Sequence, residues 1–280
     1  MKGPNYQDRI ERNYQVAVNG EGIGDLWRDL SRCLPRHGLR PIYEITCVGS
    51  VYFDNRDFDL TRYNLLNGGR YLLVRLRTYE SYGETPKPIS DYWIEVKIRE
   101  KDRWRKKRFR LNRAELLGFL EGKEPGPGLL EAQENGVRPE IVFSLYRETQ
   151  ETMLTNGLKP MLLLTYRRVA FQNECERVCL DSDIQYYHVS ANVFSYDSWK
   201  YPIEEPVGRS QKTILEIKYP PGKLPIWHGE LEKRYFLRHT NFSKYVEGMG
   251  FLFHGPLRHH KEANYFMPRI ESYMVNSERL

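Results

Sequence analysis

The sequence predicts an α+β protein built on a closed antiparallel β-barrel with helices packed outside. Three observations support this fold class. Segments with the composition of β-strands dominate the chain, and clusters of turn-forming residues separate them. A few helical segments lie between these strands, no domain linker divides the chain, and no internal repeat is present. Most of the strands also carry charged residues on one face and apolar residues on the other.

The expected strands are rich in Tyr, Val, Ile and Leu, residue types that favour a pleated and half-buried backbone. Turn formers lie between them, as in Asn-Gly-Gly at 67–69 and the Gly- and Pro-containing segment 82–88. In chain order, the expected strands are residues 10–18, 44–54, 69–80, 91–100, 104–111, 160–172, 176–187 and 213–219.

Helices are expected at residues 22–34, 112–122, 138–157 and, in pieces, 228–252. The first segment has apolar residues at helical spacing. Asn112 can cap the second, because its side chain accepts a hydrogen bond from the first turn. Gly157 ends the third, since glycine tolerates the left-handed conformation that follows many helices.

The chain has 280 residues, of which 29% are charged, and a mean hydropathy of −0.66. No stretch approaches the roughly 20 apolar residues that cross a bilayer, and residues 1–12 lack the apolar core of a signal peptide. Four irregularly spaced cysteines indicate reduced thiols in a cytoplasmic protein. We expect one domain over residues 1–254, followed by a C-terminal extension of unknown role, 255–280, as an extended tail.

The net charge of +6 and pI near 9.0 suggest an anionic partner, although an ordinary basic surface explains them equally well. The distribution of charge is more informative. In "YWIEVKIRE", Tyr92 and alternate residues form an apolar face, while Trp93, Glu95, Lys97 and Arg99 form the opposite one. The same sorting recurs, with Arg75, Arg77, Lys97, Arg99, Lys106, Arg108, Arg110, Arg168, Arg177 and Lys218 as cations and Glu11, Glu95, Asp181, Asp183 and Glu216 as carboxylates.

Two architectures produce such sorted strands. In a half-solvated sheet the charged faces point to open water, and in a closed barrel they line a water-filled lumen. The cations on these faces outnumber the carboxylates by two to one. If they are enclosed, this excess requires a polyanion to neutralise it. Period-2 sorting alone leaves both architectures open.

Nine short segments resemble the VTC domain, the catalytic domain of the vacuolar transporter chaperone complex and a member of the triphosphate tunnel metalloenzyme (CYTH-like) superfamily. They follow the order of the family and extend over roughly residues 9 to 250. The segments are "RIERNY", "SVYFDN", "VRLRTY", "WIEVKIRE", "KKRF", "YRRVAFQ", "ERVCLDSD", "ILEIKY" and "FSKYVEG".

This resemblance implies a closed antiparallel triphosphate tunnel with a divalent metal, Mn²⁺ or Mg²⁺. Its enzymes transfer the terminal phosphoryl group of ATP to a growing polyphosphate chain. The resemblance implies that catalytic contacts to phosphate come from Arg75, Arg77, Lys97, Arg168, Arg177 and Lys218, and substrate binding from Glu11, Asn13, Glu95, Lys106, Arg108, Ser243 and Lys244. It makes Glu216 the metal ligand.

One position departs from the family pattern R-x-E-x-K-Y in the first strand. Arg9 and Glu11 match it, but Asn13 stands where the lysine is expected, and Arg12 points to the other face. Losing one charged contact to phosphate costs on the order of 2–3 kcal/mol.

The departure leaves three functions open within the fold. We expect a polyphosphate polymerase that uses ATP and polyphosphate, with a triphosphate or polyphosphate hydrolase and a non-catalytic polyphosphate-binding module as alternatives. Nucleic acid is not an expected partner, because the cations are dispersed over strands and no known motif is present. Any membrane partner is expected to be a separate polypeptide.

Overall fold

The computed structural model describes residues 10–16, 22–67, 71–81, 91–100, 103–131, 133, 138–189, 205–222, 224–235 and 237–277. Within these residues the chain is an α+β protein centred on one ten-stranded antiparallel sheet. The strands are β1 (Ile10–Val16), β2 (Arg40–Asp54), β3 (Tyr71–Ser81), β4 (Tyr92–Glu100), β5 (Arg103–Leu111), β6 (Lys159–Gln172), β7 (Arg177–His188), β8 (Gly208–Arg209), β9 (Thr213–Tyr219) and β10 (Arg238–Thr240).

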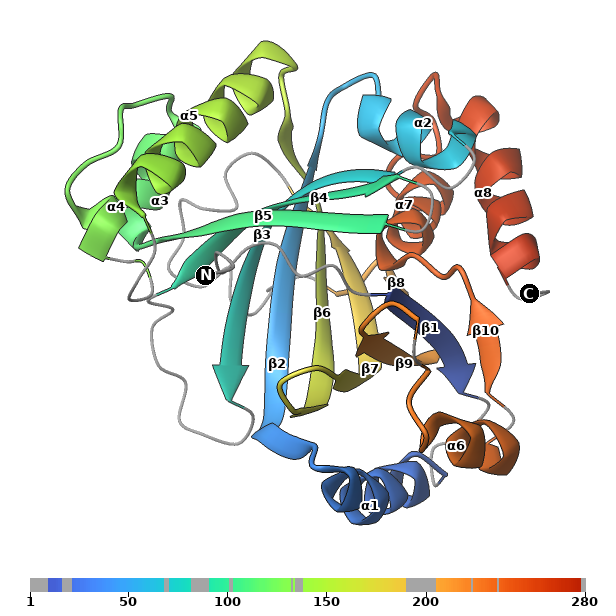
Figure 1. Cartoon of the computed structure of the whole chain (residues 1–280). Helices are drawn as coiled ribbons and strands as arrows, with labels where there is room; N and C mark the ends of the chain where they lie inside the picture. Colours follow the sequence, from blue (N-terminus) through green and yellow to red (C-terminus); the bar gives the residue numbers. More distant parts are fainter. Residues whose placement is uncertain are drawn as a thin grey trace.

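The strands pair in the order β10-β1-β9-β7-β6-β2-β3-β4-β5, and β8 adds to β7. All eight strands that the sequence predicts are present. The sheet curves so strongly that β1 comes close to β5, which lies at the other end of this order (Figure 1). Among the described residues, the edge strands β10 and β5 are not hydrogen-bonded to each other.

Helices cover the convex face of the sheet in two places. The apolar faces of β3, β4 and β5 pack against α3 (Arg113–Leu120) and α5 (Pro139–Thr155), with the short α4 (Gly128–Glu131) beside them. Asn112 caps α3 as expected, because its side chain accepts a hydrogen bond from the Glu115 amide at 2.9 Å. Gly157 follows α5 with a positive φ of 61°.

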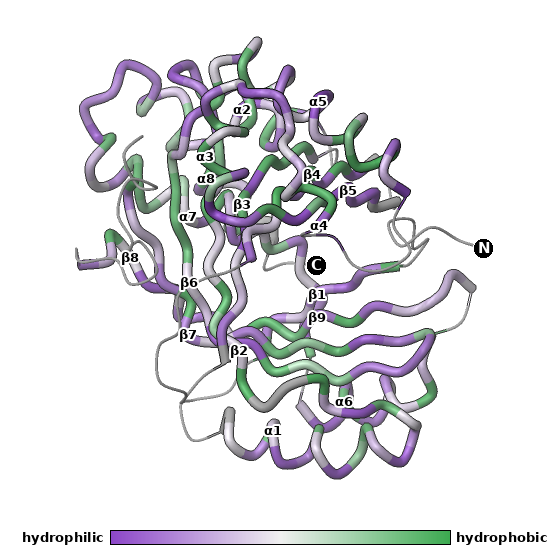
Figure 2. Tube along the Cα trace, turned by 90° about the vertical axis from the view of Figure 1, so that its left-hand side faces the viewer, coloured by the Kyte–Doolittle hydropathy of each residue, from purple (hydrophilic) through white to green (hydrophobic). Residues whose placement is uncertain are grey.

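The second covered region lies under β1, β7 and β9. It packs against α1 (Gly22–Cys33), the 3₁₀ turn at Leu34–His37 and α6 (His228–Tyr235). Figure 2 shows α1 and α6 together on this side of the sheet. Trp227, which is 1% exposed, donates a hydrogen bond from its indole to Glu176 at 2.9 Å and ties the start of α6 to β7.

The concave face is apolar at one end, and helices fill it there. Leu162, Leu164 and Tyr186 point inward and pack against α7 (Lys244–His254) and α8 (Ala263–Ser277). The expectation that all helices pack outside the sheet is therefore wrong for α7 and α8. The physical reason is that these inward residues are apolar and need apolar partners to be buried. The rest of the face is charged and cannot supply such partners, so the two helices do.

Close packing of α7 depends on a glycine. A Cβ atom added to Gly248 would lie 2.5 Å from Leu162 Cδ2 and 2.7 Å from Tyr186 Cδ1. Next to it, the Tyr186 hydroxyl donates a hydrogen bond to Glu247 Oε2 at 2.6 Å. The helix can thus lie directly on β6 and β7 only where one of its residues has no side chain.

Helix α8 differs from the extended tail that the sequence predicts after residue 255. Its residues Ala263, Phe266 and Ile270 belong to the same apolar cluster as α7. Helix α2 (Asp59–Leu66) is not predicted from the sequence, and its N-terminus is held by the buried carboxylate of Asp54. None of the helices in the described part of the chain is long and apolar enough to cross a bilayer.

A bulge in β7 changes the face of one predicted residue. Asp183 has a positive φ of 52°, and the pairing register with β6 shifts between Thr165 and Arg167. Asp183 therefore leaves the face shared by Arg177 and Asp181, is exposed, and pairs with Arg167 at 3.4 Å. Period-2 reasoning placed it with Asp181 because an extra residue in a strand is invisible in the sequence pattern.

Candidate functional site

The first group of charged side chains is centred on Glu95, which is fully buried on β4. Arg75 donates two hydrogen bonds to its Oε2, at 2.6 and 2.9 Å. Arg77 lies 3.8 Å from the same oxygen, and Lys106 lies 3.3 Å from Oε1. Burial would raise the pKa of Glu95, but Lys106, Arg75 and Arg77 outweigh it and hold the pKa well below its usual range.

Strand β2 fixes the two arginines from the other side. The Arg75 guanidinium donates a hydrogen bond to the Tyr52 hydroxyl at 3.0 Å, and Arg77 Nε donates to Ser50 Oγ at 3.1 Å. Both arginines are less than 10% exposed. A guanidinium that is held in this way presents its remaining N–H groups in a fixed direction, which suits the recognition of phosphate oxygens.

The second group is centred on Glu11 of β1. Glu11 Oε1 accepts a hydrogen bond from Lys97 Nζ of β4 at 2.9 Å, and its Oε2 lies 3.6 Å from Lys218 Nζ of β9. Strands β1 and β4 are not neighbours in the sheet, so the first contact crosses the concave space. Burial lowers the pKa of Lys97, although Glu11 opposes this effect.

The third group is centred on Glu216 of β9. Its Oε1 lies 2.9 Å from Lys218 Nζ and 3.6 Å from Arg168, but neither contact has hydrogen-bond geometry. Burial would raise the pKa of Glu216, and Lys218 and Arg168 outweigh this effect and hold it well below the usual range. In the sheet register, Glu216 lies between Asn13 on β1 and Cys179 on β7.

The fourth group joins α7 to the sheet through Asp181, which is fully buried. Arg168 donates two hydrogen bonds to its carboxylate, at 2.6 and 2.7 Å. Lys244, the first residue of α7, donates a third at 2.7 Å. The preceding Ser243 caps the helix by accepting a hydrogen bond from the Val246 amide at 3.4 Å, so its hydroxyl is used in holding α7.

Two further predicted cations complete the set. Arg177 of β7 donates from Nε to Cys179 Sγ at 3.3 Å. Arg108 of β5 lies over the Trp93 ring, with its Cζ 4.2 Å from the ring centroid. Burial lowers the pKa of Arg177, and Cys179 and Glu216 oppose and outweigh this effect.

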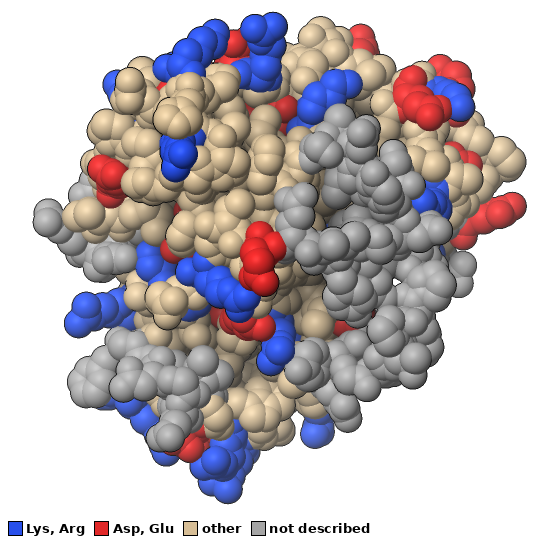
Figure 3. Space-filling view, turned by 180° about the vertical axis from the view of Figure 1, so that it is seen from behind, with Lys and Arg blue, Asp and Glu red and all other residues tan. Residues whose placement is uncertain are grey.

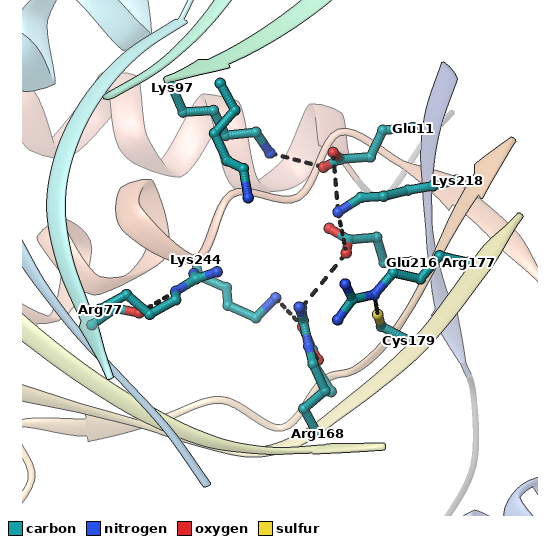
Figure 4. Close-up of polar contacts among 12 residues, drawn as sticks. Glu11, Arg77, Lys97, Arg168, Arg177, Cys179, Glu216, Lys218 and Lys244 are labelled. Carbon is teal, nitrogen blue, oxygen red and sulfur yellow. Dashed lines mark hydrogen bonds and ion pairs between the residues drawn. The ribbon is translucent and has the colours of Figure 1, made fainter. Parts of the chain in front are cut away.

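These groups share one space. Figure 4 shows side chains from β1, β3, β4, β6, β7, β9 and α7 pointing toward one another across the concave face. Nine cations meet four carboxylates there: Arg75, Arg77, Lys97, Lys106, Arg108, Arg168, Arg177, Lys218 and Lys244, with Glu11, Glu95, Asp181 and Glu216. The excess of positive charge on this face favours a ligand with several negative charges.

Lys106 is a residue of this set whose charge responds to pH near neutrality. Glu95, the largest influence, raises its pKa, but burial and the cations Arg108, Lys218 and Arg77 outweigh it and lower the pKa to about 7. The side chain still keeps 42% of its surface accessible, so it borders the open part of the space.

The residues present fit a divalent metal of the hard class. Glu216 Oε1 is a buried carboxylate oxygen that accepts no hydrogen bond from the described residues. Among those residues, no three His, Cys, Asp or Glu side chains are arranged to hold a metal ion. Mg²⁺ and Mn²⁺ need few protein ligands when phosphate oxygens and water complete the shell, so one carboxylate is sufficient.

Two neighbours of the predicted residues have roles that the sequence pattern does not indicate. Asp181 was left without a definite role, and it orients Arg168 and Lys244 together. The sequence pattern does not single out Tyr52, whose hydroxyl accepts a hydrogen bond from Arg75. Tyr52 and Ser50 are two positions apart on β2, so their side chains share the concave face, and this spacing is the signal that could have indicated the contact.

The chain is similar to three curated proteins named vacuolar transporter chaperone complex subunit 4. It is 25% identical to the Trypanosoma brucei brucei protein over 252 residues, covering 80% of this chain and 30% of that protein. It is 27% identical to the Trypanosoma cruzi protein over 246 residues, with the same coverage. The Schizosaccharomyces pombe protein is 25% identical over 284 residues, covering 90% and 39%. The chain thus spans about a third of the length of these relatives.

Solved structures resemble the chain at lower identity. A putative adenylate cyclase from Bacillus halodurans is 14% identical, with a TM-score of 0.46, and the match covers 86% of this chain and 96% of that one. The mimivirus capping enzyme triphosphatase is 11% identical, with a TM-score of 0.36, and the match covers 83% and 88%.

The family comparison is more extensive. The model of the VTC domain family matches residues 4–253, which include every strand of the sheet and helix α7 up to its penultimate residue. Each of the predicted site residues lies inside this match. The chain belongs to the VTC domain family.

Proposed function

We propose that this protein is a polyphosphate polymerase that transfers the terminal phosphoryl group of ATP to a polyphosphate chain. The single observation that carries the proposal is the convergence of cations on the concave face. Arg75, Arg77, Arg168 and Lys218 come from separate strands and are held by buried carboxylates around one space. Phosphoryl transfer needs mainly positioning and the stabilisation of charge on phosphate oxygens, and fixed guanidinium groups supply both.

The carboxylates have a second effect. Each one holds at least two cations, so the ligand-free site is partly neutralised and its side chains are already oriented. A phosphate chain then binds to groups that need little rearrangement, which lowers the entropic cost of binding. We infer that Lys97 and Glu11 close the tunnel over this chain by joining β4 to β1.

Glu216 would hold Mg²⁺ or Mn²⁺ in the proposed reaction. The bound ion would neutralise negative charge on the phosphate oxygens of the donor. Lys218 and Arg168 lie against the same carboxylate, so they would orient it and contact phosphate from the other side. Burial of Glu216 keeps bulk water from competing for this oxygen.

The test is to incubate the purified protein with ATP and Mn²⁺ and to analyse the products by gel electrophoresis and by ³¹P NMR. Growth of polyphosphate together with ADP is expected. Glu216→Gln should abolish chain growth, and Glu232→Gln, an exposed change on α6, should not. Release of free phosphate in place of chain growth would show a hydrolase, and an absence of turnover would contradict both reactions.

Asn13 favours a second candidate, a non-catalytic polyphosphate-binding module. It lies opposite Glu216 in the register of β1 and β9, where a lysine would add a positive charge beside the metal ligand. Metal-independent binding of polyphosphate without turnover would support this candidate. Asn13→Lys should then tighten binding of tripolyphosphate by about tenfold or more, because one charged hydrogen bond to phosphate is added.

A further inference from the structure

Trp93 is a large aromatic side chain on the charged face of the sheet. It precedes Glu95 and Lys97 on β4 at period-2 spacing, and it belongs to none of the three apolar clusters of the described residues. In the sheet register it lies between Arg77 on β3 and Arg110 on β5. A half-buried tryptophan that belongs to no apolar cluster and lies between two arginines requires another explanation.

Two planar, positively charged guanidinium groups lie near the Trp93 ring. The Arg108 guanidinium lies 4.2 Å from the ring centroid, and that of Arg110 lies 5.7 Å away. Arg110 is also paired with the exposed Asp91 at 3.4 Å, at the end of β4. Tyr79, whose residue surface is 40% exposed, follows Arg77 on the same face of β3. Aromatic rings and guanidinium planes together form the surfaces on which proteins stack nucleobases.

Trp93 also lies next to the cations that are proposed to bind phosphate. Arg77, which faces Trp93 across β3 and β4, is one of the cations gathered around Glu95. A nucleotide with its phosphates along Arg77 and Arg75 would therefore reach Trp93 with its other end. On the face seen in Figure 3, the described Lys and Arg side chains lie among Asp and Glu side chains.

We propose that Trp93, Arg108, Arg110 and Tyr79 form a stacking platform for the base of the nucleoside triphosphate donor. This inference rests on the proposed function, because it assigns the nucleoside end of the same ligand. Stacking uses the π face that every base has, so the platform accepts purines with little discrimination between adenine and guanine. Inorganic tripolyphosphate has no base and gains nothing from it.

The alternative is that Trp93 only holds Arg108 in place through a cation–π contact. The two roles predict different results. If Trp93 only positions Arg108, its removal weakens every phosphate ligand equally. If Trp93 stacks a base, its removal weakens nucleotides and spares tripolyphosphate.

The experiment compares ATP and tripolyphosphate as ligands by isothermal titration calorimetry, with wild type, Trp93→Ala and the matched control Trp93→Phe. We expect Trp93→Ala to weaken ATP binding by about ten- to hundredfold and tripolyphosphate binding by no more than about twofold. Trp93→Phe, which retains a ring, should keep most of the affinity for ATP. An equal loss for both ligands, or no loss for ATP, overturns the platform.

Fluorescence gives a second measurement in case Trp93→Ala does not fold. ATP should quench the indole emission of wild type, tripolyphosphate should not, and the difference should vanish in Trp93→Phe. Equal quenching in wild type and Trp93→Phe overturns the platform. A wild-type protein that binds tripolyphosphate without any preference for ATP contradicts the platform alone, whereas one that binds neither ligand contradicts the proposed function as well.

Discussion

Lys97 and Glu11 meet across the concave face of the sheet, with the lysine Nζ 2.9 Å from a glutamate oxygen. Their strands, β4 and β1, lie near opposite ends of the hydrogen-bonded order. Both side chains are largely buried, at 15% and 8% exposed. The pair therefore joins two strands of the sheet that are not paired directly with each other in the described part of the chain.

This contact predicts a measurable coupling. Lys97→Met, Glu11→Gln and the double variant should be compared in urea denaturation. Each single change removes the nearest ion-pair partner of a largely buried charge and should lower the free energy of unfolding by about 2–4 kcal/mol. The double variant should cost clearly less than the sum, with a coupling of about 1 kcal/mol or more. Additive effects would show that the pair does not join the strands energetically.

Lys106 predicts how binding depends on pH. Its pKa of about 7 in the free protein means that it loses its charge as the pH rises from 6 to 8. A cation at this position favours a phosphate ligand, so the affinity for tripolyphosphate should fall over this range. Lys106→Arg, which stays charged, should remove the part of this decrease in affinity that arises from titration of Lys106. An identical slope in both proteins would assign the pH dependence to titration of the ligand.

His228 predicts a loss of stability in acid. Its ring is 2% exposed, contacts the Tyr14 hydroxyl at 2.7 Å through Nε2, and has a buried Nδ1 that forms no hydrogen bond with the described residues. Burial lowers its pKa, so the folded state binds a proton less readily than the unfolded chain. The stabilisation is present above pH 6.5, the ordinary pKa of histidine, and is lost as the pH falls below it.

The measurement is the free energy of unfolding between pH 8 and pH 5. His228→Gln should have a smaller decrease over this range than wild type, although it is less stable at pH 8. His259→Gln, a change in an exposed turn, serves as the matched control and should follow the wild-type curve. A wild-type slope in His228→Gln would contradict the assignment.

Gly248 predicts that α7 tolerates no side chain at this position. Gly248→Ala should lower the free energy of unfolding by about 1–3 kcal/mol, because the methyl group would overlap Leu162 and Tyr186. Gly229→Ala in α6 is the matched control. A Cβ there meets nothing within 4 Å, and alanine favours helix, so its stability should be unchanged or higher. Equal effects of the two changes would show that α7 does not lie this close to the sheet.

Much of the fold could be predicted because its signals are local. Alternation of residues such as Trp93, Glu95 and Lys97 identifies a strand and its two faces without any knowledge of its partners. The family resemblance also predicted cations that the structure brings to one face, such as Arg75, Arg168 and Lys218. The face of Asp183 was predicted wrongly, because one bulged residue reverses the parity of a strand and leaves no trace in its composition.

The sequence by itself determined the strands, the sorting of charge onto one face of each, and the family to which the chain belongs. Only the tertiary structure decided which carboxylate holds which cation, as Asp181 does for Arg168 and Lys244. It also decided that α7 and α8 occupy the apolar end of the concave face. The physical reason is range: strand periodicity arises between neighbouring residues, whereas these contacts join residues more than ten positions apart, which strand pairing and helix packing bring together.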